Sequence, residues 1–203
     1  MRAVILGNGT ITDYDYIKKL IHDDDFIICA DGGANHLEKL GISANVLVGD
    51  FDSVEKKVKD AAEVIQYPTH KDFTDGELCM DYAVKNGFQN ILLLGMSGTR
   101  LDHTINNILL LFRCKNGCLV NEYCEIYALT DEIYINGRKG KTLSIIPMKG
   151  DLEGITTYGL DYPLKNGTLY FGEARGNSNV INEDSARITV KKGKGIVIIS
   201  NGE

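Results

Sequence analysis

The chain has no apolar run that approaches the ~20 residues needed to cross a bilayer, so we expect no membrane-spanning segment. It also has no block of basic residues: 22 Lys and Arg stand against 28 Asp and Glu, which gives a net charge of −6. Proteins that bind nucleic acids need a positive face that displaces counterions, so we expect no nucleic-acid partner. If the ligand is a polyphosphate, this acidic chain must supply positive charge locally, and a bound metal ion is the usual source.

A disulfide-scaffold pattern is absent as well. The cysteines are odd in number, which favours a reducing compartment and predicts a cytoplasmic protein; they are Cys29, Cys79, Cys114, Cys118 and Cys124. The last three match no common zinc motif and have no neighbouring His, so we interpret them as small buried hydrophobic residues. The apolar part of residues 1–7 is too short for a signal peptide and is typical of a first strand.

The standard phosphate-binding motifs are missing. No Gly-x-x-x-x-Gly-Lys-Ser/Thr sequence occurs, which excludes a P-loop kinase. Gly7-Asn8-Gly9 follows the first expected strand and resembles only the beginning of a dinucleotide fingerprint, because Thr12 stands where the third glycine belongs. A contribution of this turn to nucleotide binding stays open.

Two patterns divide the 203 residues, of which 43% are hydrophobic. Up to residue 127, short apolar runs (3–6, 26–30, 46–48, 64–67, 91–94) alternate with amphipathic stretches (14–21, 34–40, 54–62, 77–85). This alternation predicts a parallel sheet covered by helices. From residue 128 to 203, short alternating runs (142–146, 168–171, 188–190, 196–200) are separated by turn signals at 149–151 and 192–194, which predicts a small antiparallel β-sandwich.

Polar clusters follow four of the expected parallel strands, at 31–33, 49–53, 71–77 and 95–103. The carboxyl ends of parallel strands meet at one edge of the sheet, where ligands bind. A single Asp in such a loop is more often a helix cap, and Ser53 and Thr74 are plausible caps. Capping needs one short polar residue per helix, however, and so it does not explain Asp50 together with Asp52, or a second Asp near Asp75.

The chemistry of these clusters suits a magnesium–phosphate site. Residues i and i+2 of an extended segment point the same way, so Asp50 and Asp52 can present both carboxylates to one cation. Mg²⁺ prefers such oxygen ligands and shares its coordination with substrate phosphates. Arg100, two residues before Asp102, can fork onto a phosphate. Glycines at 32, 33, 95 and 98 would let backbone N–H groups approach phosphate oxygens closely.

The ordered series of clusters resembles the thiamine pyrophosphokinase family, whose members carry Asp-Gly-Gly, Gly-Asp-x-Asp-Ser, Asp-x-Thr-Asp and Gly-Arg-x-Asp-His. The corresponding segments here are 31–33, 49–53, 72–75 and 98–103, and the second half matches through 159–164 and 177–179. Coverage is nearly the whole chain. Two departures are Thr99, where the family usually has Gly, and Tyr162, where many members have Trp.

The resemblance implies a Rossmann-like α/β domain, a C-terminal β-sandwich, and a homodimer with thiamine bound between subunits. The implied reaction is attack of the thiamine hydroxyl on the β-phosphorus of ATP, which releases AMP. By carry-over, Asp50, Asp52 and Asp75 hold Mg²⁺, and Arg100 and Asp102 position the phosphates and the hydroxyl. The implied ATP- and phosphate-binding residues are Asp31, Gly32, Lys71, Thr74 and Arg100.

The implied thiamine pocket uses Tyr162 as its stacking face, with Ser178 and Asn179 lining it. The residues alone, without the resemblance, favour the alternative of Tyr162 packed in the sandwich core and a plain turn at 177–179. His103 is open between a structural and a catalytic role. Two other functions also stay open: another Mg²⁺-dependent phosphoryl transferase or nucleotide hydrolase, and a thiamine-binding sensor without catalysis.

Overall fold

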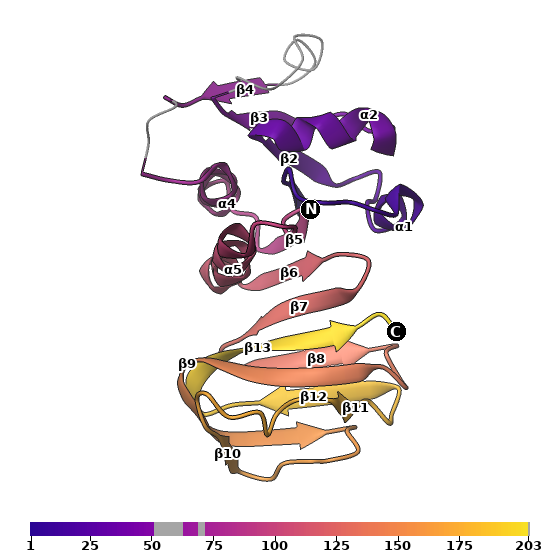
Figure 1. Cartoon of the computed structure of the whole chain (residues 1–203), viewed down its shortest axis with the longest axis vertical. Helices are drawn as coiled ribbons and strands as arrows, with labels where there is room; N and C mark the ends of the chain where they lie inside the picture. The colour runs from indigo at the N-terminus through magenta and orange to yellow at the C-terminus, as the bar shows by residue number, and fades with distance from the viewer. Residues whose placement is uncertain (51–62, 69–71, 203) are drawn as a thin grey trace. The chain divides into compact units, whose positions relative to one another are not determined.

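Figure 1 shows a computed structural model of the chain, which describes residues 1–50, 63–68 and 72–202. The chain separates into two compact units: unit 1 comprises Met1–Glu122, and unit 2 begins at Tyr123. Within the described ranges, no helix combines the length and the apolar character that a membrane crossing requires.

The described residues of unit 1 form a parallel sheet of six strands in the order β4-β3-β2-β1-β5-β6. Their bounds are β1 Ala3–Leu6, β2 Phe26–Ala30, β3 Val46–Gly49, β4 Glu63–Gln66, β5 Asn90–Leu94 and β6 Asn116–Val120. β1 lies inside the sheet, where Val4 pairs with Ile27 on one side and Leu92 on the other. Every residue of β1 is buried, as expected for a parallel strand covered on both faces. The predicted parallel pairing is confirmed, and β6 is an additional strand.

The helical elements of unit 1 connect these strands (Figure 1). They are α1 Tyr14–Lys19, the 3₁₀ helix η1 Asp31–His36, α2 Leu37–Leu40, α4 Asp75–Lys85, α5 Leu101–Leu110 and the 3₁₀ helix η2 Leu111–Arg113. Asp13 caps α1 by accepting a hydrogen bond from the Tyr16 N–H, and Thr74 caps α4 by accepting one from the Glu77 N–H. The expected helix at 54–62 lies outside the described residues, and α5 was not predicted.

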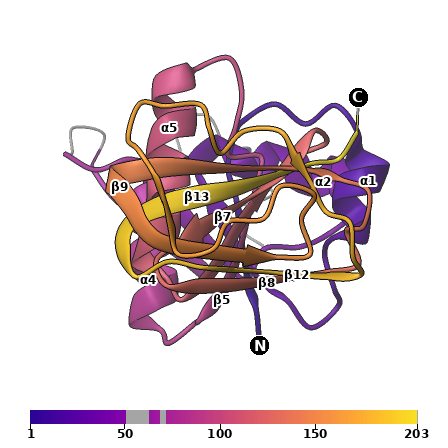
Figure 2. The same ribbon diagram turned by 90° about the horizontal axis from the view of Figure 1, so that it is seen from below.

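Unit 2 is antiparallel throughout its described strands, in the order β7-β13-β9-β12-β8, with β10 and β11 also paired to β9. The bounds are β7 Cys124–Leu129, β8 Glu132–Asn136, β9 Thr142–Tyr158, β10 Gly167–Leu169, β11 Asn179–Val180, β12 Ser185–Thr189 and β13 Lys192–Ser200. The first part of β9 pairs with β13, and its last three residues pair with β12. Figure 2 shows β12 beside β8 and β9 beside β13.

The expected turns at 149–151 and 192–194 are wrong, because both segments lie inside strands, β9 and β13. Gly150 (φ 69°) and Gly193 (φ 97°) adopt left-handed backbone conformations there, and the pairing of β13 with β9 shifts register on either side of Lys194. Glycine within a strand commonly marks such an irregularity rather than an end of the strand. The turn signals therefore mark bends in two long strands.

Each unit has its own core. In unit 1, residues such as Val4, Leu6, Leu47 and Leu94 are fully buried together. Unit 2 buries an aliphatic cluster drawn from β7, β8, β9, β10, β12 and β13. None of the five cysteines, all of which lie in the described ranges, forms a disulfide, but Cys114, Cys118 and Cys124 are half-buried rather than buried as expected.

Candidate active site

A cleft of about 380 Å³ lies in unit 1, at the carboxyl ends of its parallel strands. It is lined by residues 7–10 after β1, 30–32 after β2, 74–76 at the start of α4, 95–100 after β5, and 103, 104 and 107 on α5. The predicted residues that line it are Asp31, Gly32, Thr74, Asp75 and Arg100. The sequence therefore predicted the correct edge of the sheet for a cleft of this kind.

Other predicted residues lie elsewhere. Asp50 and Asp102 do not line the cleft, and Asp52 and Lys71 lie outside the described residues. Tyr162 belongs to unit 2, as do Ser178 and Asn179.

The loops after β1 and β5 are bonded to each other and form one side of the cleft. Gly9 N donates to Gly95 O at 2.6 Å, and Thr10 N donates to Ser97 O at 3.0 Å. Asn8, whose side chain would meet any Cβ placed on Gly32, completes this wall. The turn at residues 7–9, whose role the sequence left open, is thus part of the cleft.

His36 stabilises this wall through a hydrogen bond to Gly9. Its Nε2 lies 3.0 Å from Gly9 O, and its Nδ1 lies 2.7 Å from the Tyr14 hydroxyl. A carbonyl oxygen only accepts, so Nε2 must carry the proton and Nδ1 accepts from Tyr14. Burial lowers the pKa of the His36 imidazole, despite the hydrogen bond to Gly9 O, which favours the charged form. The sequence carried no signal for this contact, because 27 residues separate its partners.

The acidic residues gather at the ends of β2 and β3. Asp31 begins η1 with φ 39°, an unusual backbone conformation for a residue other than glycine. A Cβ placed on Gly49 would lie 2.9 Å from the Asp31 Cβ, so the chain at Asp31 and the chain before Asp50 are in direct contact. Asp50 and Asp75 are both half-buried. These carboxylates have the oxygen chemistry that a hard divalent cation prefers.

A metal site requires ligand atoms that lie close together, in addition to the right kind of donor atom. Within the described ranges, one group of three His, Cys, Asp or Glu residues brings its ligand atoms within 4.8 Å of one another, namely His22, Asp24 and Asp25. Asp25 in that group already bonds Arg2 through both carboxylate oxygens, at 2.9 and 2.6 Å. Asp50 and Asp75 belong to no such trio among the described residues, and Asp52, the third predicted ligand, is not among them.

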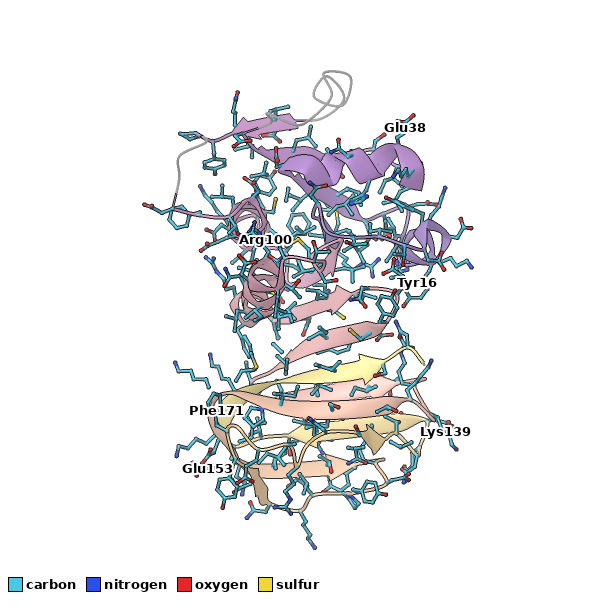
Figure 3. All side chains as sticks on the ribbon, in the orientation of Figure 1. Tyr16, Glu38, Arg100, Lys139, Glu153 and Phe171 are labelled. Carbon is cyan, nitrogen blue, oxygen red and sulfur yellow. The ribbon has the colours of Figure 1, made fainter. Side chains whose placement is uncertain are left out.

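Arg100 and Asp102 form a bidentate ion pair at the start of α5, where Figure 3 labels Arg100. Arg100 Nε donates to Asp102 Oδ1 at 2.9 Å, and Nη2 donates to Oδ2 at 2.6 Å. The hydrogen bond from Arg100 holds the pKa of Asp102 well below its usual range, and the same pair raises the pKa of Arg100. Nη1 takes no part in this pair, so the guanidinium keeps an edge for an anion in the cleft.

In unit 2, Tyr162 is 73% exposed, which excludes the alternative that it packs in the core. Ser178 has a left-handed backbone (φ 57°), and its N–H donates to Ser144 Oγ at 3.1 Å. The side chain of Asn179 is bonded to the backbone of Tyr162. Of the residues that the sequence assigned to one pocket, Asn179 therefore contacts Tyr162, and Ser178 precedes Asn179 in the chain.

Two family models match this chain in succession. The first, "Thiamin pyrophosphokinase, catalytic domain", covers residues 17–124, and the second, "Thiamin pyrophosphokinase, vitamin B1 binding domain", covers residues 130–197. Thiamine pyrophosphokinase 1 of Oryza sativa subsp. japonica is 30% identical over 195 residues, which cover 80% of this chain and 74% of that protein. Thiamine pyrophosphokinase of Bacillus subtilis is 28% identical over 183 residues, 85% of each chain. The crystal structure of thiamine pyrophosphokinase from Bacillus subtilis matches with a TM-score of 0.89 and 26% identity, covering 100% of both chains.

Proposed function

Because this chain belongs to the thiamine pyrophosphokinase family, we propose that the cleft of unit 1 is where it holds ATP during catalysis. The chain is an ATP-dependent transferase that moves the diphosphate group of ATP to the hydroxyl of thiamine, giving thiamine diphosphate and AMP. The observation that carries the proposed ATP site is the convergence of the loops after β1, β2 and β5 on one cleft. Its position at the carboxyl edge of a parallel sheet supports a Rossmann-like assignment of unit 1.

Diphosphate transfer requires the thiamine oxygen to bond to the β-phosphorus of ATP while the bond between that phosphorus and the oxygen bridging to the α-phosphorus breaks. AMP leaves with the bridging oxygen, and the hydroxyl proton is released. Arg100 binds phosphate oxygens through the guanidinium edge that Asp102 does not occupy, so Asp102 acts by orienting Arg100. Asp31, Gly32, Lys71 and Thr74 are the remaining proposed phosphate-binding residues, and three of them, all but Lys71, line the cleft.

The N-terminus of α4 supports the same placement of the phosphates. Thr74, Asp75 and Gly76 line the cleft, and the 11-residue helix directs its positive end toward it. Thr74 uses its hydroxyl oxygen to cap the helix, at 3.1 Å from Glu77 N. It can still donate its hydroxyl proton to a phosphate, because the cap uses it only as an acceptor.

The divalent ion is Mg²⁺ in this proposal, held by Asp50, Asp52 and Asp75. Carboxylate oxygens at the ends of strands and at the cleft suit this ion, and in a chain with a net charge of −6 a bound cation would add positive charge at the polyphosphate. When bound, the ion would neutralise charge that develops on the transferred phosphates. His103 lines the cleft and is a candidate to receive the hydroxyl proton or to shape the wall.

Thiamine binding is assigned to unit 2, which we take to be the β-sandwich domain predicted at 128–203, and ATP and Mg²⁺ binding to the domain predicted at 1–127. The exposed Tyr162 ring suits stacking on a cationic thiazolium or an aromatic pyrimidine. Asn179, which bonds the Tyr162 backbone, and Ser178, which precedes it in the chain, are the other residues of the proposed pocket. β9 supports the sandwich assignment, because its first part pairs with β13 in one sheet and its last three residues pair with β12 in a second sheet.

A homodimer with the site at the subunit interface is also part of the proposal. An apolar stripe on α5 supports it: Leu101, Ile105 and Leu109, spaced four residues apart, are 68%, 45% and 43% exposed. Stripes of this kind commonly mark an interaction surface. Five cysteines without a disulfide among the described residues support a cytoplasmic location.

The test is AMP release, measured with a coupled assay in the presence and absence of thiamine and of Mg²⁺. The proposal expects AMP only when both are present. It also expects Arg100→Ala to lower turnover by at least ~10²-fold, because positioned charges on transferred phosphates contribute that much. Full activity of that variant would remove Arg100 from the site.

A further inference from the structure

The segment that carries Tyr162 is fixed at both sides of this residue. Leu160 is buried and forms a β-bridge with Ile181, and Asp161 N donates to Val180 O at 3.0 Å. On the other side, Leu164 N donates to the Thr157 hydroxyl at 2.8 Å. The backbone around the exposed ring is therefore anchored to strands on both sides.

Asn179 adds a contact to Tyr162 itself. Its Oδ1 accepts from Tyr162 N at 3.0 Å, and its Nδ2 donates to Tyr162 O at 2.8 Å. Because a backbone N–H only donates and a carbonyl only accepts, these two partners fix which end of the amide is oxygen. The Asn179 amide thus makes the two hydrogen bonds with the Tyr162 backbone that a residue of a paired strand would make.

The bonding capacity of this amide is nearly used up. Oδ1 also accepts from Val180 N at 2.9 Å, so both of its lone pairs are occupied. Nδ2 has one hydrogen left after its bond to Tyr162 O. The side chain of Asn179 therefore has no acceptor to offer to the amino group of an aminopyrimidine.

We propose that Asn179 is a positioning residue that acts through Tyr162, holding its backbone so that the exposed ring is already oriented for stacking. This inference rests on the proposed thiamine site in unit 2. It changes the role of Asn179 from a hydrogen-bonding partner of thiamine to a support for the aromatic face. A ring held in place before binding avoids the free-energy cost of ordering it in the complex.

The experiment is a double-mutant cycle on the whole protein, with Michaelis constants for thiamine and for ATP measured by AMP release. Tyr162→Ala should raise the thiamine KM roughly 2- to 30-fold, the range for loss of stacking and cation–π contact. Asn179→Ala should raise it roughly 2- to 10-fold, the cost of ordering one freed side chain. In the Tyr162→Ala background, Asn179→Ala should add less than about twofold.

Asn182→Ala is the matched control. Asn182 is an exposed Asn that also holds this segment, donating from Nδ2 to Asp161 Oδ1 at 3.0 Å, but no described contact joins its side chain to Tyr162. It should leave the thiamine KM within about twofold of the unmodified enzyme. Asn179→Asp keeps the acceptor oxygen but replaces the donor to Tyr162 O by a negatively charged oxygen that repels this carbonyl, and it replaces Asn179→Ala in the cycle if the alanine variant does not fold.

Each outcome decides the inference. If the double mutant raised the thiamine KM by the product of the two single-mutant factors, Asn179 would contact thiamine independently of Tyr162, and this result would overturn the inference. The inference would also be overturned if Asn179→Ala raised the ATP KM as much as the thiamine KM, or if Asn182→Ala raised the thiamine KM as much as Asn179→Ala does. Either result would show that Asn179 only stabilises the segment in general. If the unmodified enzyme released no AMP in response to thiamine, the proposed function itself would fail, which is a distinct result.

Discussion

Gly9→Ala should damage the ATP cleft while leaving the proposed thiamine site intact. A Cβ at this position would lie 2.3 Å from Ser97 O and 2.5 Å from Gly95 O, both backbone atoms. The loops after β1 and β5 would have to separate by about 1 Å to restore ordinary contact. That movement would break the hydrogen bonds from Gly9 N to Gly95 O and from Thr10 N to Ser97 O.

The expected cost combines overpacking with two lost hydrogen bonds, about 2–4 kcal/mol of unfolding free energy. For a chain of this size the thermal midpoint should fall by roughly 5–12 °C. The ATP KM should rise by at least ~10-fold, because a misplacement of about 1 Å in a positioning loop is costly. Differential scanning fluorimetry and AMP-release kinetics measure the two effects.

Gly98→Ala is the control on the same wall. A Cβ there would lie 3.2 Å from Thr10 N and Thr10 Oγ1, so a shift of a few tenths of an ångström relieves it. The cost should stay below about 1 kcal/mol. If Gly9→Ala kept the thermal midpoint and the ATP KM of the unmodified enzyme, the loop contact would not shape the ATP site and the reasoning would be refuted.

Three further predictions concern single side chains. Asp50→Asn should lower turnover by at least ~10²-fold at saturating Mg²⁺ with an unchanged circular dichroism spectrum, because it removes a metal ligand; near-normal turnover would remove Asp50 from the metal site. Arg100→Lys should lower turnover more than thiamine affinity, because Lys keeps the charge but cannot pair with Asp102 and a phosphate through a planar fork; equal turnover would show that charge alone matters. Burial lowers the pKa of His36 in the folded state, so the unfolded state takes up a proton first as the pH falls below its usual value of 6.5, and the stability tied to neutral His36 is lost there. His36→Gln should therefore lose less stability than the unmodified enzyme between about pH 7 and 5.5 in urea titrations, and identical losses would contradict this assignment.

The sequence predicted the strands of unit 1 that are short, apolar and buried on both faces, as in β2, which matches the expected residues 26–30. It missed β6, because Gly117 and Cys118 interrupt the apolar pattern of 116–120. It missed α5, because the stripe of Leu101, Ile105 and Leu109 follows a glycine-containing loop and faces solvent. Hydrophobic periodicity indicates which residues of an element are buried. β6 lacks a continuous apolar pattern and the apolar stripe of α5 is exposed, so periodicity did not predict these two elements.

At the candidate site, the sequence predicted the edge of the sheet and five residues of the cleft, because parallel strands bring their following loops together. It could not predict the contact of His36 with Gly9, nor the bond of Asn179 to the Tyr162 backbone, 17 residues away. Both depend on how loops from different strands meet. The pattern of one loop does not contain that information.

The order of the strands has a consequence for folding during synthesis. Every strand of the parallel sheet has appeared once Val120 has been made, so unit 1 can complete its described pairing while the rest of the chain is still being translated. In unit 2, β13 is last along the chain but pairs with both β7 and β9. Until Lys192–Ser200 leave the ribosome, the edges of β7 and β9 that later pair with β13 have no partner strand. Because unpaired strand edges promote aggregation, the nascent chain most needs protection during this interval.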